Sequence, residues 1–306
     1  MCKKVSILLS IYKPIEEYLK KQLISLNEQT YENLELVVWN DCPDCEVDET
    51  IFASHITKFP FKIYDQHINL GYAKAFEKLV TFAQGEYICF CDQDDIWDKE
   101  KIKKCITALE EENGAVAVCD KSIIDENDKI VIESVKKSSN WSYEKWATGD
   151  DITHKAIFMC HAPGMSIHAR KSDVEKYIPF APEVAHDRWL MAMLSAQGKA
   201  VYVEEALVKY RRYGRNVSGV LSGIQTKKEY YAIRCNNTNF ISRFKQYFPN
   251  HQHIEKIEKC NSARMSGNPI KIFKNRGCIP DLFKYEFLLA LCPDFLFRPL
   301  VKLLFK

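Results

Sequence analysis

Short apolar runs that alternate with amphipathic helical segments constrain the fold of this chain more than any other feature. Each run is rich in branched or aromatic residues and too short for a helix, which is typical of a buried β-strand. The runs cover residues 5–10, 34–41, 61–66, 87–91 and 115–120, and helical periodicity follows in residues 14–27, 72–82 and 98–112. This alternation predicts an α/β fold with a Rossmann-like, mostly parallel, doubly wound sheet.

Acidic residues stand at the carboxyl ends of two of these runs. Asp41 ends the second run, and Asp92, Asp94 and Asp95 follow the fourth in the stretch Cys-Asp-Gln-Asp-Asp-Ile-Trp. Ligands of such sheets bind beyond the carboxyl ends of the strands, so these acids lie where a ligand is expected. Because like charges repel and resist burial, we expect a positive partner beside them.

The acidic turn has the chemistry of a metal site. Carboxylates two residues apart, such as Asp92 and Asp94, can converge on one divalent cation, and their hard oxygen atoms suit Mg²⁺ or Mn²⁺. Such ions also take up substrate phosphates. The alternative is an acidic loop that caps the following helix, with Asp98 as the N-cap.

Three further groups each have two interpretations. Asp41 can accept hydrogen bonds from a base or ribose, or form an Asx-turn with the following residues. The pair His186-Asp187 can cap a helix, or supply a general base with a neighbour that tunes it. The stretch 210–219, with arginines among tyrosines and glycines, suits phosphate recognition in a loop or a solvated basic surface.

Length and charge limit the classes of function. The 306 residues suit one large domain with an appendage, and the net charge of +2 gives no reason to expect nucleic acid as a partner. Residues 264–306 carry eight Lys/Arg and three Asp/Glu, a net of +5, so the first 263 residues carry −3 (2 − 5). Basic helices rich in aromatic residues can lie in a membrane interface, or pack on the catalytic domain.

The twelve cysteines do not indicate a secreted disulfide framework. The first residues lack a signal peptide, and Cys89, Cys91 and Cys119 lie inside apolar strands, where a thiol acts as a small hydrophobe. We therefore expect reduced thiols and a cytoplasmic protein. Cys42 and Cys45 have metal or redox spacing, but without a second pair we expect neither role. We also expect no membrane-spanning helix.

The motifs together resemble glycosyltransferase family 2. They are SILLSIYKP, LELVVWND, NLGYAKAFEKLVTFAQGEYICFCDQDDIW and HDRWLMAMLSAQGKAVYVEEALVKYRRYGRNVSG, in this order over about residues 4–219. The DQDD-W form and the last segment are similar to bacterial rhamnosyltransferase-like enzymes of surface polysaccharide synthesis. The resemblance implies a GT-A fold in residues 1–220, with a nucleotide-sugar-binding half (1–120) and an acceptor half (121–220). Residues 221–306 would form a helical C-terminal extension.

The resemblance also assigns roles to individual residues. It implies an inverting, Mn²⁺- or Mg²⁺-dependent transfer in which Asp187 is the catalytic base and Asp94, with Asp92, holds the metal. The remaining residues that it places at the substrates are Ser10, Ile11, Tyr12, Asp41, Asn69, Gly71, Lys74, Asp92, Gln93, Gly164, His186, Trp189 and Arg211.

Two positions depart from the family pattern. Asn40-Asp41-Cys42-Pro43 replaces the usual Asp-Asp-Gly-Ser, which loses the first acid. Tyr213 stands where close relatives often have His, which puts the role of the last segment in doubt. Arg211, Arg212 or Arg215 would be the residues that compensate.

The implied partners are a nucleotide-sugar donor and a glycan or lipid-linked glycan acceptor, at the inner face of the cell membrane. The likeness to rhamnosyltransferases favours dTDP-rhamnose, whereas a UDP-linked hexose fits the same pocket. Two alternatives stay open: an inactive nucleotide-sugar-binding or scaffold protein, and a nucleotidyltransferase. The nucleotidyltransferase would need a Gly-rich basic loop after the first strand, and Ser10–Tyr18 lacks the glycines.

Overall fold

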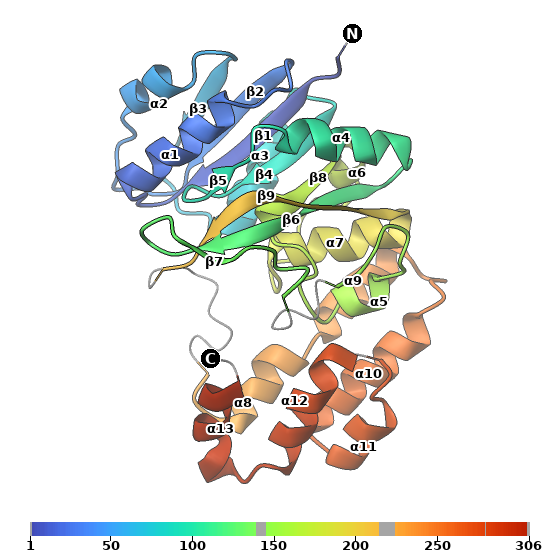
Figure 1. The fold of residues 1–306 in the computed structure, drawn as a ribbon. Coiled ribbons are helices and arrows are strands. Elements are labelled where there is room, and N and C mark those ends of the chain that lie inside the picture. The colour runs from blue at the N-terminus through green and yellow to red at the C-terminus, as the bar shows by residue number, and fades with distance from the viewer. Residues whose placement is uncertain (1, 139–144, 214–223, 279, 305–306) are drawn as a thin grey trace. The chain divides into compact units, whose positions relative to one another are not determined.

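A computed structural model describes residues 2–138, 145–213, 224–278 and 280–304. The chain divides into two compact units. The first comprises Met1–Ile152 and Cys160–Tyr213, and the second comprises Thr153–Met159 and Gly214–Lys306. Figure 1 shows the β-sheet in the first unit and a group of helices in the second.

The described strands of the first unit form one sheet in the order β3-β2-β1-β4-β8-β6-β9-β5, and β7 pairs with β6 (Figure 1). The strands are β1 (Val5–Ile11), β2 (Leu34–Asn40), β3 (Phe61–Asp65), β4 (Tyr87–Cys91), β5 (Ile96–Trp97), β6 (Val116–Ile124), β7 (Ile130–Ile132), β8 (Ile167–Arg170) and β9 (Ala200–Arg211). The half from β3 to β4 is parallel. In the other half β8 lies antiparallel between β4 and β6, and β6 is parallel to β9.

Helices cover both faces of this sheet. They are α1 (Glu16–Asn27), α2 (Glu49–His55), α3 (Tyr72–Phe82), α4 (Lys101–Glu111), α6 (Lys171–Glu175) and α7 (His186–Gln197). On one face Ile7 and Leu9 of β1 share a buried core with Leu23 of α1 and Ile106 of α4. On the other face Phe76 of α3 packs against Phe90 of β4, with 5.5 Å between ring centroids. The sheet is therefore doubly wound, and the predicted fold class is confirmed.

Most predicted elements of the first unit are confirmed. The fourth strand and the helix at 72–82 have the predicted bounds, whereas α1 begins at Glu16 and not at Pro14. Asp98 lies one turn before α4, where its Oδ1 accepts a hydrogen bond from the Glu100 N–H at 2.9 Å. The N-cap is Glu100, so the prediction that Asp98 is the cap was wrong by two residues.

The second unit is helical where it is described. Its helices are α5 (Thr153–Ala156), α8 (Lys227–Tyr230), α9 (Thr238–Tyr247), α10 (Ile254–Ser266), α11 (Pro269–Lys274), α12 (Pro280–Leu291) and α13 (Phe297–Leu304). A π-helical turn (Tyr231–Cys235) follows α8, and a 3-10 turn (Asp294–Leu296) precedes α13. Tyr230, Leu289 and Phe297 belong to its buried core.

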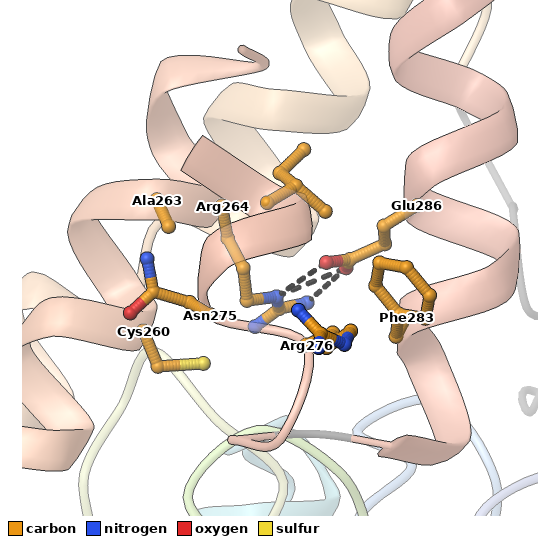
Figure 2. Close-up of a pocket in the computed structure, with 8 residues that line it drawn as sticks. Cys260, Ala263, Arg264, Asn275, Arg276, Phe283 and Glu286 are labelled. Atoms are coloured by element: carbon orange, nitrogen blue, oxygen red, sulfur yellow. Dashed lines mark hydrogen bonds and ion pairs between the residues drawn. The ribbon is translucent and has the colours of Figure 1, made fainter. Parts of the chain in front are cut away.

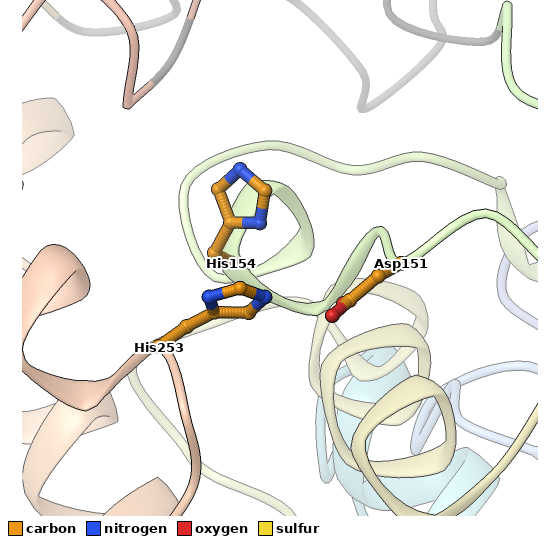
Figure 3. Close-up of side chains that lie close together, drawn as sticks. All are labelled: Asp151, His154 and His253. Atoms are coloured by element: carbon orange, nitrogen blue, oxygen red, sulfur yellow. The ribbon is translucent and has the colours of Figure 1, made fainter.

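Histidine rings join α5 to the start of α10. His154 and His253 lie with 4.9 Å between ring centroids, as Figure 3 shows. Lys256 Nζ lies 3.1 Å from His154 Nε2. These contacts explain why 153–159 groups with the C-terminal helices and not with the sheet. Among the described residues, no helix combines the length and the apolar character needed to cross a bilayer.

Candidate active site

The carboxyl ends of β1 and β4 are joined by a pair of amide hydrogen bonds. The backbone N–H of Tyr12 donates to Gln93 Oε1 at 2.8 Å, and Gln93 Nε2 donates to the Tyr12 carbonyl oxygen at 3.1 Å. This exchange fixes the acidic turn 92–95 against the end of the first strand. The Tyr12 side chain itself is exposed, and Ser10 is half-buried.

Asp41 connects three segments at the same edge of the sheet. Its Oδ1 accepts hydrogen bonds from the backbone N–H of Leu70 at 2.7 Å and from Trp39 Nε1 at 3.1 Å, and its Oδ2 accepts one from Gly71 N–H at 3.0 Å. Its own N–H donates to the Ile11 carbonyl oxygen at 2.8 Å. The Asp41 side chain is buried, and its hydrogen bonds to Leu70 and Gly71 hold the turn that starts α3.

The turn that Asp41 holds has a backbone that requires glycine. Gly71 has φ +75° and lies at the N-cap of α3, with no atom within 4 Å of the position a Cβ would take. Asn69 Oδ1 accepts a hydrogen bond from the backbone N–H of Gly71 at 3.1 Å. The structure thus brings Ile11, Asp41, Asn69 and Gly71 together. Lys74, in the first turn of α3, is exposed.

Asn40 explains why the usual first acid can be absent here. Its Nδ2 donates to the carbonyl oxygen of Cys45 at 2.7 Å and to Asp65 Oδ2 at 2.9 Å. A carboxylate at position 40 has no proton to donate and would repel Asp65. Cys42 and Cys45 form a disulfide across the loop that Asn40 holds, with 5.4 Å between their Cα atoms.

The disulfide is a correction to the expectation that every cysteine is reduced. The turn at Pro43 brings Cys42 and Cys45 within the distance that a disulfide spans. The other ten cysteines are thiols, as predicted, and Cys89, Cys91 and Cys119 are buried.

The acidic turn concentrates negative charge in a poorly hydrated place. Burial, together with the charges of Asp94 and Asp187, raises the pKa of Asp92 to about 7. Burial also raises the pKa of Asp94, and it raises that of Asp95 well above its ordinary range. The structure brings the first turn of α7 to the end of β4, because the ring of His186 lies 5.3 Å from that of Phe90, two residues before Asp92.

A buried lysine lies behind these acids, and sequence reasoning missed it. Lys101, the first residue of α4, is fully buried, with its Nζ 2.9 Å from the centroid of the Trp97 ring. Its charge opposes the rise in the pKa of Asp92 and Asp95. The signal in the sequence was its spacing, because Lys101 lies four residues before Cys105 of the same helix, which faces the core.

The end of β9 holds the acidic turn from the other side. Arg211 is fully buried, its Nε donates to the Asp94 carbonyl oxygen at 2.8 Å, and its backbone N–H donates to Asp95 Oδ1 at 3.0 Å. Arg211 Nη1 also forms an ion pair with Asp128. These contacts favour a positioning role for Arg211 over a direct contact with phosphate.

Tyr213, the second departure from the family pattern, contacts the proposed metal ligand. Its hydroxyl donates to Asp94 Oδ2 at 2.8 Å, and its ring packs edge-on against Tyr18 at 5.4 Å. Arg212, also suggested as a compensating residue, is half-buried, with its guanidinium carbon 5.7 Å from the Tyr210 ring centroid. Residues 214–219 of the predicted phosphate-binding stretch, including Arg215, lie outside the described residues.

His186 lies in an aromatic enclosure next to Asp187. Its ring is 4.3 Å from that of Phe76 and 5.3 Å from that of Phe90, measured between centroids. It is 5% exposed, and burial lowers its pKa to about 4, so the ring is neutral at physiological pH. Gly164 faces it, because a Cβ there would come within 2.6 Å of His186 Nε2.

Trp189 is held away from solvent one turn further along α7. It is 1% exposed, and its Nε1 donates to the Tyr177 carbonyl oxygen at 2.9 Å. Its geometry favours anchoring the helix that carries Asp187 over contact with a substrate.

The residues of the acidic turn fit a hard divalent cation. Asp92 and Asp94 offer carboxylate oxygens, which Mg²⁺ and Mn²⁺ prefer. Burial raises the pKa of both carboxyls, and a bound cation would favour their ionised forms. Asp95 Oδ2 is buried without a hydrogen-bond partner among the described residues.

The half-parallel, doubly wound sheet with flanking helices is the GT-A fold. A crystal structure of S. aureus TarS (residues 1–349) with UDP-GlcNAc has this fold, with a TM-score of 0.62 and 17% identity over 98% of this chain and 90% of that one. A mannosyltransferase from Pyrobaculum calidifontis with GDP-Man and Mn²⁺ gives a TM-score of 0.58 at 15% identity, over 99% and 79%.

The sequence comparison identifies the family. Residues 6–168, more than half of the chain, match the Glycosyl transferase family 2 model. The chain therefore belongs to glycosyltransferase family 2.

Two curated relatives show how far the similarity extends. An uncharacterized glycosyltransferase of Haemophilus influenzae is 27% identical over 79% of this chain and 76% of its own length. An Escherichia coli enzyme named UDP-Glc:alpha-D-GlcNAc-diphosphoundecaprenol beta-1,3-glucosyltransferase is 30% identical over 40% of this chain and 47% of its own length.

Proposed function

We propose that this glycosyltransferase is inverting and metal-dependent, and that it moves a hexose from a nucleotide-sugar to a glycan hydroxyl. The observation that carries the proposal is the contact between α7 and β4 beside the acidic turn: the ring of His186, the neighbour of Asp187, lies 5.3 Å from that of Phe90, two residues before Asp92. One carboxylate suited to a base thus lies near others suited to a cation. This is the arrangement that a displacement between two bound substrates requires.

The donor would bind along the carboxyl ends of β1, β2 and β4. Asp41 and the Asn69–Gly71 turn are the proposed contacts to the base and ribose, together with Ser10 to Tyr12 at the end of β1. Asp94 and Asp92 would hold Mn²⁺ or Mg²⁺. When bound, this ion would neutralise the charge that develops on the leaving diphosphate.

Asp187 would act on the acceptor. As the acceptor hydroxyl attacks the anomeric carbon, the Asp187 carboxylate takes the hydroxyl proton, and the bond from that carbon to the diphosphate oxygen breaks. Attack on the face opposite the leaving group inverts the configuration. His186, neutral and enclosed by rings, would hold the first turn of α7 in place without adding charge beside the base.

The names of relatives and the sequence motifs each suggest a different donor class. The names of the E. coli relative and of the TarS complex mention UDP-linked sugars, which favours UDP-glucose or UDP-GlcNAc. The rhamnosyltransferase-like form of the acidic turn and of residues 210–219 favours dTDP-rhamnose. The E. coli name also mentions a diphosphoundecaprenol acceptor. This supports a lipid-linked glycan acceptor, surface polysaccharide synthesis and a place at the inner face of the cell membrane.

The inactive-scaffold alternative rested on the two departures from the family pattern. Asn40 bonds to Asp65, and Tyr213 bonds to Asp94, so both departures have structural partners in this chain. Neither therefore requires a loss of activity.

Asp187→Asn tests the proposal directly. Transfer is measured as nucleoside diphosphate released from dTDP-rhamnose and from UDP-hexoses in the presence of lipid-linked saccharides. The variant should lose about a hundredfold or more of the rate, the usual contribution of a positioned general base, and should keep donor binding. Glu111→Gln, an exposed acid on α4, serves as the control and should transfer normally. Turnover at the normal rate in Asp187→Asn would remove Asp187 from the mechanism.

A further inference from the structure

The last helices of the second unit expose a group of large apolar side chains. Leu288 and Leu291 lie on α12, and Phe295 and Leu296 follow in the 3-10 turn. Their side chains are 46%, 57%, 80% and 44% exposed in this order. We refer to these four residues as the apolar face. Scattered exposed apolar residues are common, whereas several large ones in successive turns mark an interaction surface.

A buried ion pair determines which side of α12 is outermost. Glu286 accepts three hydrogen bonds from the guanidinium of Arg264, at 2.6 to 3.0 Å, and both side chains are buried (Figure 2). Leu289, one turn later on this inner side, is fully buried. Since successive helix residues are rotated by about 100°, Leu288 and Leu291 must then project from the outer side.

The turn after α12 is also held in place. Lys227 Nζ donates to the carbonyl oxygens of Ala290 at 3.1 Å and Cys292 at 2.7 Å, which satisfies acceptors at the helix end. Phe297 is buried directly after the exposed pair Phe295 and Leu296. The apolar face is therefore presented by a fixed backbone, not by a frayed terminus.

Exposed basic residues flank the apolar face in the sequence, and one exposed acid, Asp294, lies within it just before Phe295. Lys284 lies one turn before Leu288 on the same side of α12, and Arg298 follows Leu296, and both are exposed. Helices α11 and α12 are neighbours, because the ring centroids of Phe273 and Phe287 lie 5.9 Å apart. Helix α11 thus adds exposed Lys271 and Lys274. Of the three acids after residue 264, Glu286 is already paired with Arg264.

We propose that the apolar face and its basic rim bind the surface of an anionic lipid bilayer. Leucine and phenylalanine side chains would enter the boundary between headgroups and acyl chains, while Lys284 and Arg298 pair with anionic headgroups. A two-fold contact between two copies would instead bring like-charged rims together, because such an interface joins the same patch to itself. The proposal deepens the proposed function by naming the surface that would reach a lipid-linked acceptor.

Vesicle flotation with the full chain tests this surface without any sugar donor, so its result is independent of the proposed transfer activity. The probes are vesicles of phosphatidylcholine alone and of phosphatidylcholine with phosphatidylglycerol. The wild-type protein should float with the anionic vesicles and be released by high salt. The double variant Leu291→Ser/Phe295→Ser should bind at least about tenfold more weakly.

A charge variant tests the rim separately. Lys284→Gln/Arg298→Gln should weaken binding by about tenfold or more, since each basic residue near the surface contributes roughly fivefold. Matched controls are Ile130→Ser/Val131→Ser, two exposed apolar residues of β7, and Lys58→Gln/Lys78→Gln, two exposed lysines of the first unit. Both controls should float like the wild type.

Two results would overturn the proposal. The first is a failure of the vesicle test, in which the wild type does not float with anionic vesicles or both double variants float as well as the wild type. The second is that the wild type self-associates reversibly in sedimentation and Leu291→Ser/Phe295→Ser is monomeric, which would assign the face to a second copy of the chain. Circular dichroism and melting temperature of each variant show that it is folded.

Discussion

The pKa of Asp92 depends on the burial and on the charges of the whole candidate site. Asp92 is an acid at the end of a buried strand, with Asp94 and Asp187 near enough to affect it electrostatically. Lys101 offsets part of this charge from within the core. The residue is therefore poised to change its charge near neutral pH, and a bound cation would favour the ionised form.

The raised pKa of Asp92 predicts how stability depends on pH without metal. Its folded-state pKa of about 7 lies above the ordinary 3.8, so between these values the folded state keeps a proton that the unfolded state releases. The free energy of unfolding should fall as pH rises from about 4 to about 7, by up to about 4 kcal/mol from this group. Urea denaturation in EDTA at several pH values measures the slope.

Asp92→Asn provides the comparison. The amide does not titrate, so the variant should show a shallower fall in stability over the same pH range. Asp44→Asn, an exposed acid in the loop after β2, should keep the wild-type slope. Identical slopes in Asp92→Asn and wild type would contradict the environment that the structure gives Asp92.

At the scale of elements, the sequence predicted the parallel half of the sheet better than the rest. Runs such as 87–91 are apolar throughout because parallel strands are covered on both faces, and that pattern is readable. The insertion of β8 between β4 and β6 is not readable, because antiparallel pairing of a four-residue strand depends on distant partners. Helix α2 was missed for a similar reason, since only Phe52 of its seven residues is buried.

The candidate site was predictable in part. Acids at strand ends pointed to the Asp92–Asp94 turn, and the motif order pointed to Asp187. The roles of Asn40 and Tyr213 were not predictable, because their partners Asp65 and Asp94 are far away in the sequence. Arg211 was expected at the ligand, yet it is buried beneath the acidic turn.

Asp41 predicts a coupling between β2 and α3. Its two carboxylate oxygens accept from the N–H groups of Leu70 and Gly71, so Asp41→Asn would place an amide N–H₂ against one of them. The variant should lose about 1–3 kcal/mol of stability and bind nucleotide more weakly. Denaturation and nucleotide titration measure both effects, and Asp44→Asn is the matched control. Unchanged nucleotide affinity would mean that the Asn69–Gly71 turn does not serve the donor.

At the scale of the whole molecule, the charge distribution separates two roles. The first 263 residues are net acidic, and the acids include the cluster that we assign to a cation and a nucleotide-sugar. The remaining residues are net basic, at +5, and carry the apolar face. The near-neutral net charge of the whole chain is therefore the sum of a net acidic part and a net basic part. Their ligands can be tested independently, because the acids and the apolar face belong to different units.

The central claim is that the acidic turn binds a nucleotide through a divalent metal ion. The most direct measurement is a thermal-shift panel that combines UDP, dTDP, GDP or CDP with Mn²⁺, Mg²⁺ or EDTA. A ligand that binds the folded state raises the melting temperature. We expect UDP or dTDP to raise it with a metal ion and not with EDTA, and Asp94→Asn to lose the shift. No shift with any nucleotide, or an equal shift with EDTA and in Asp94→Asn, would contradict the account.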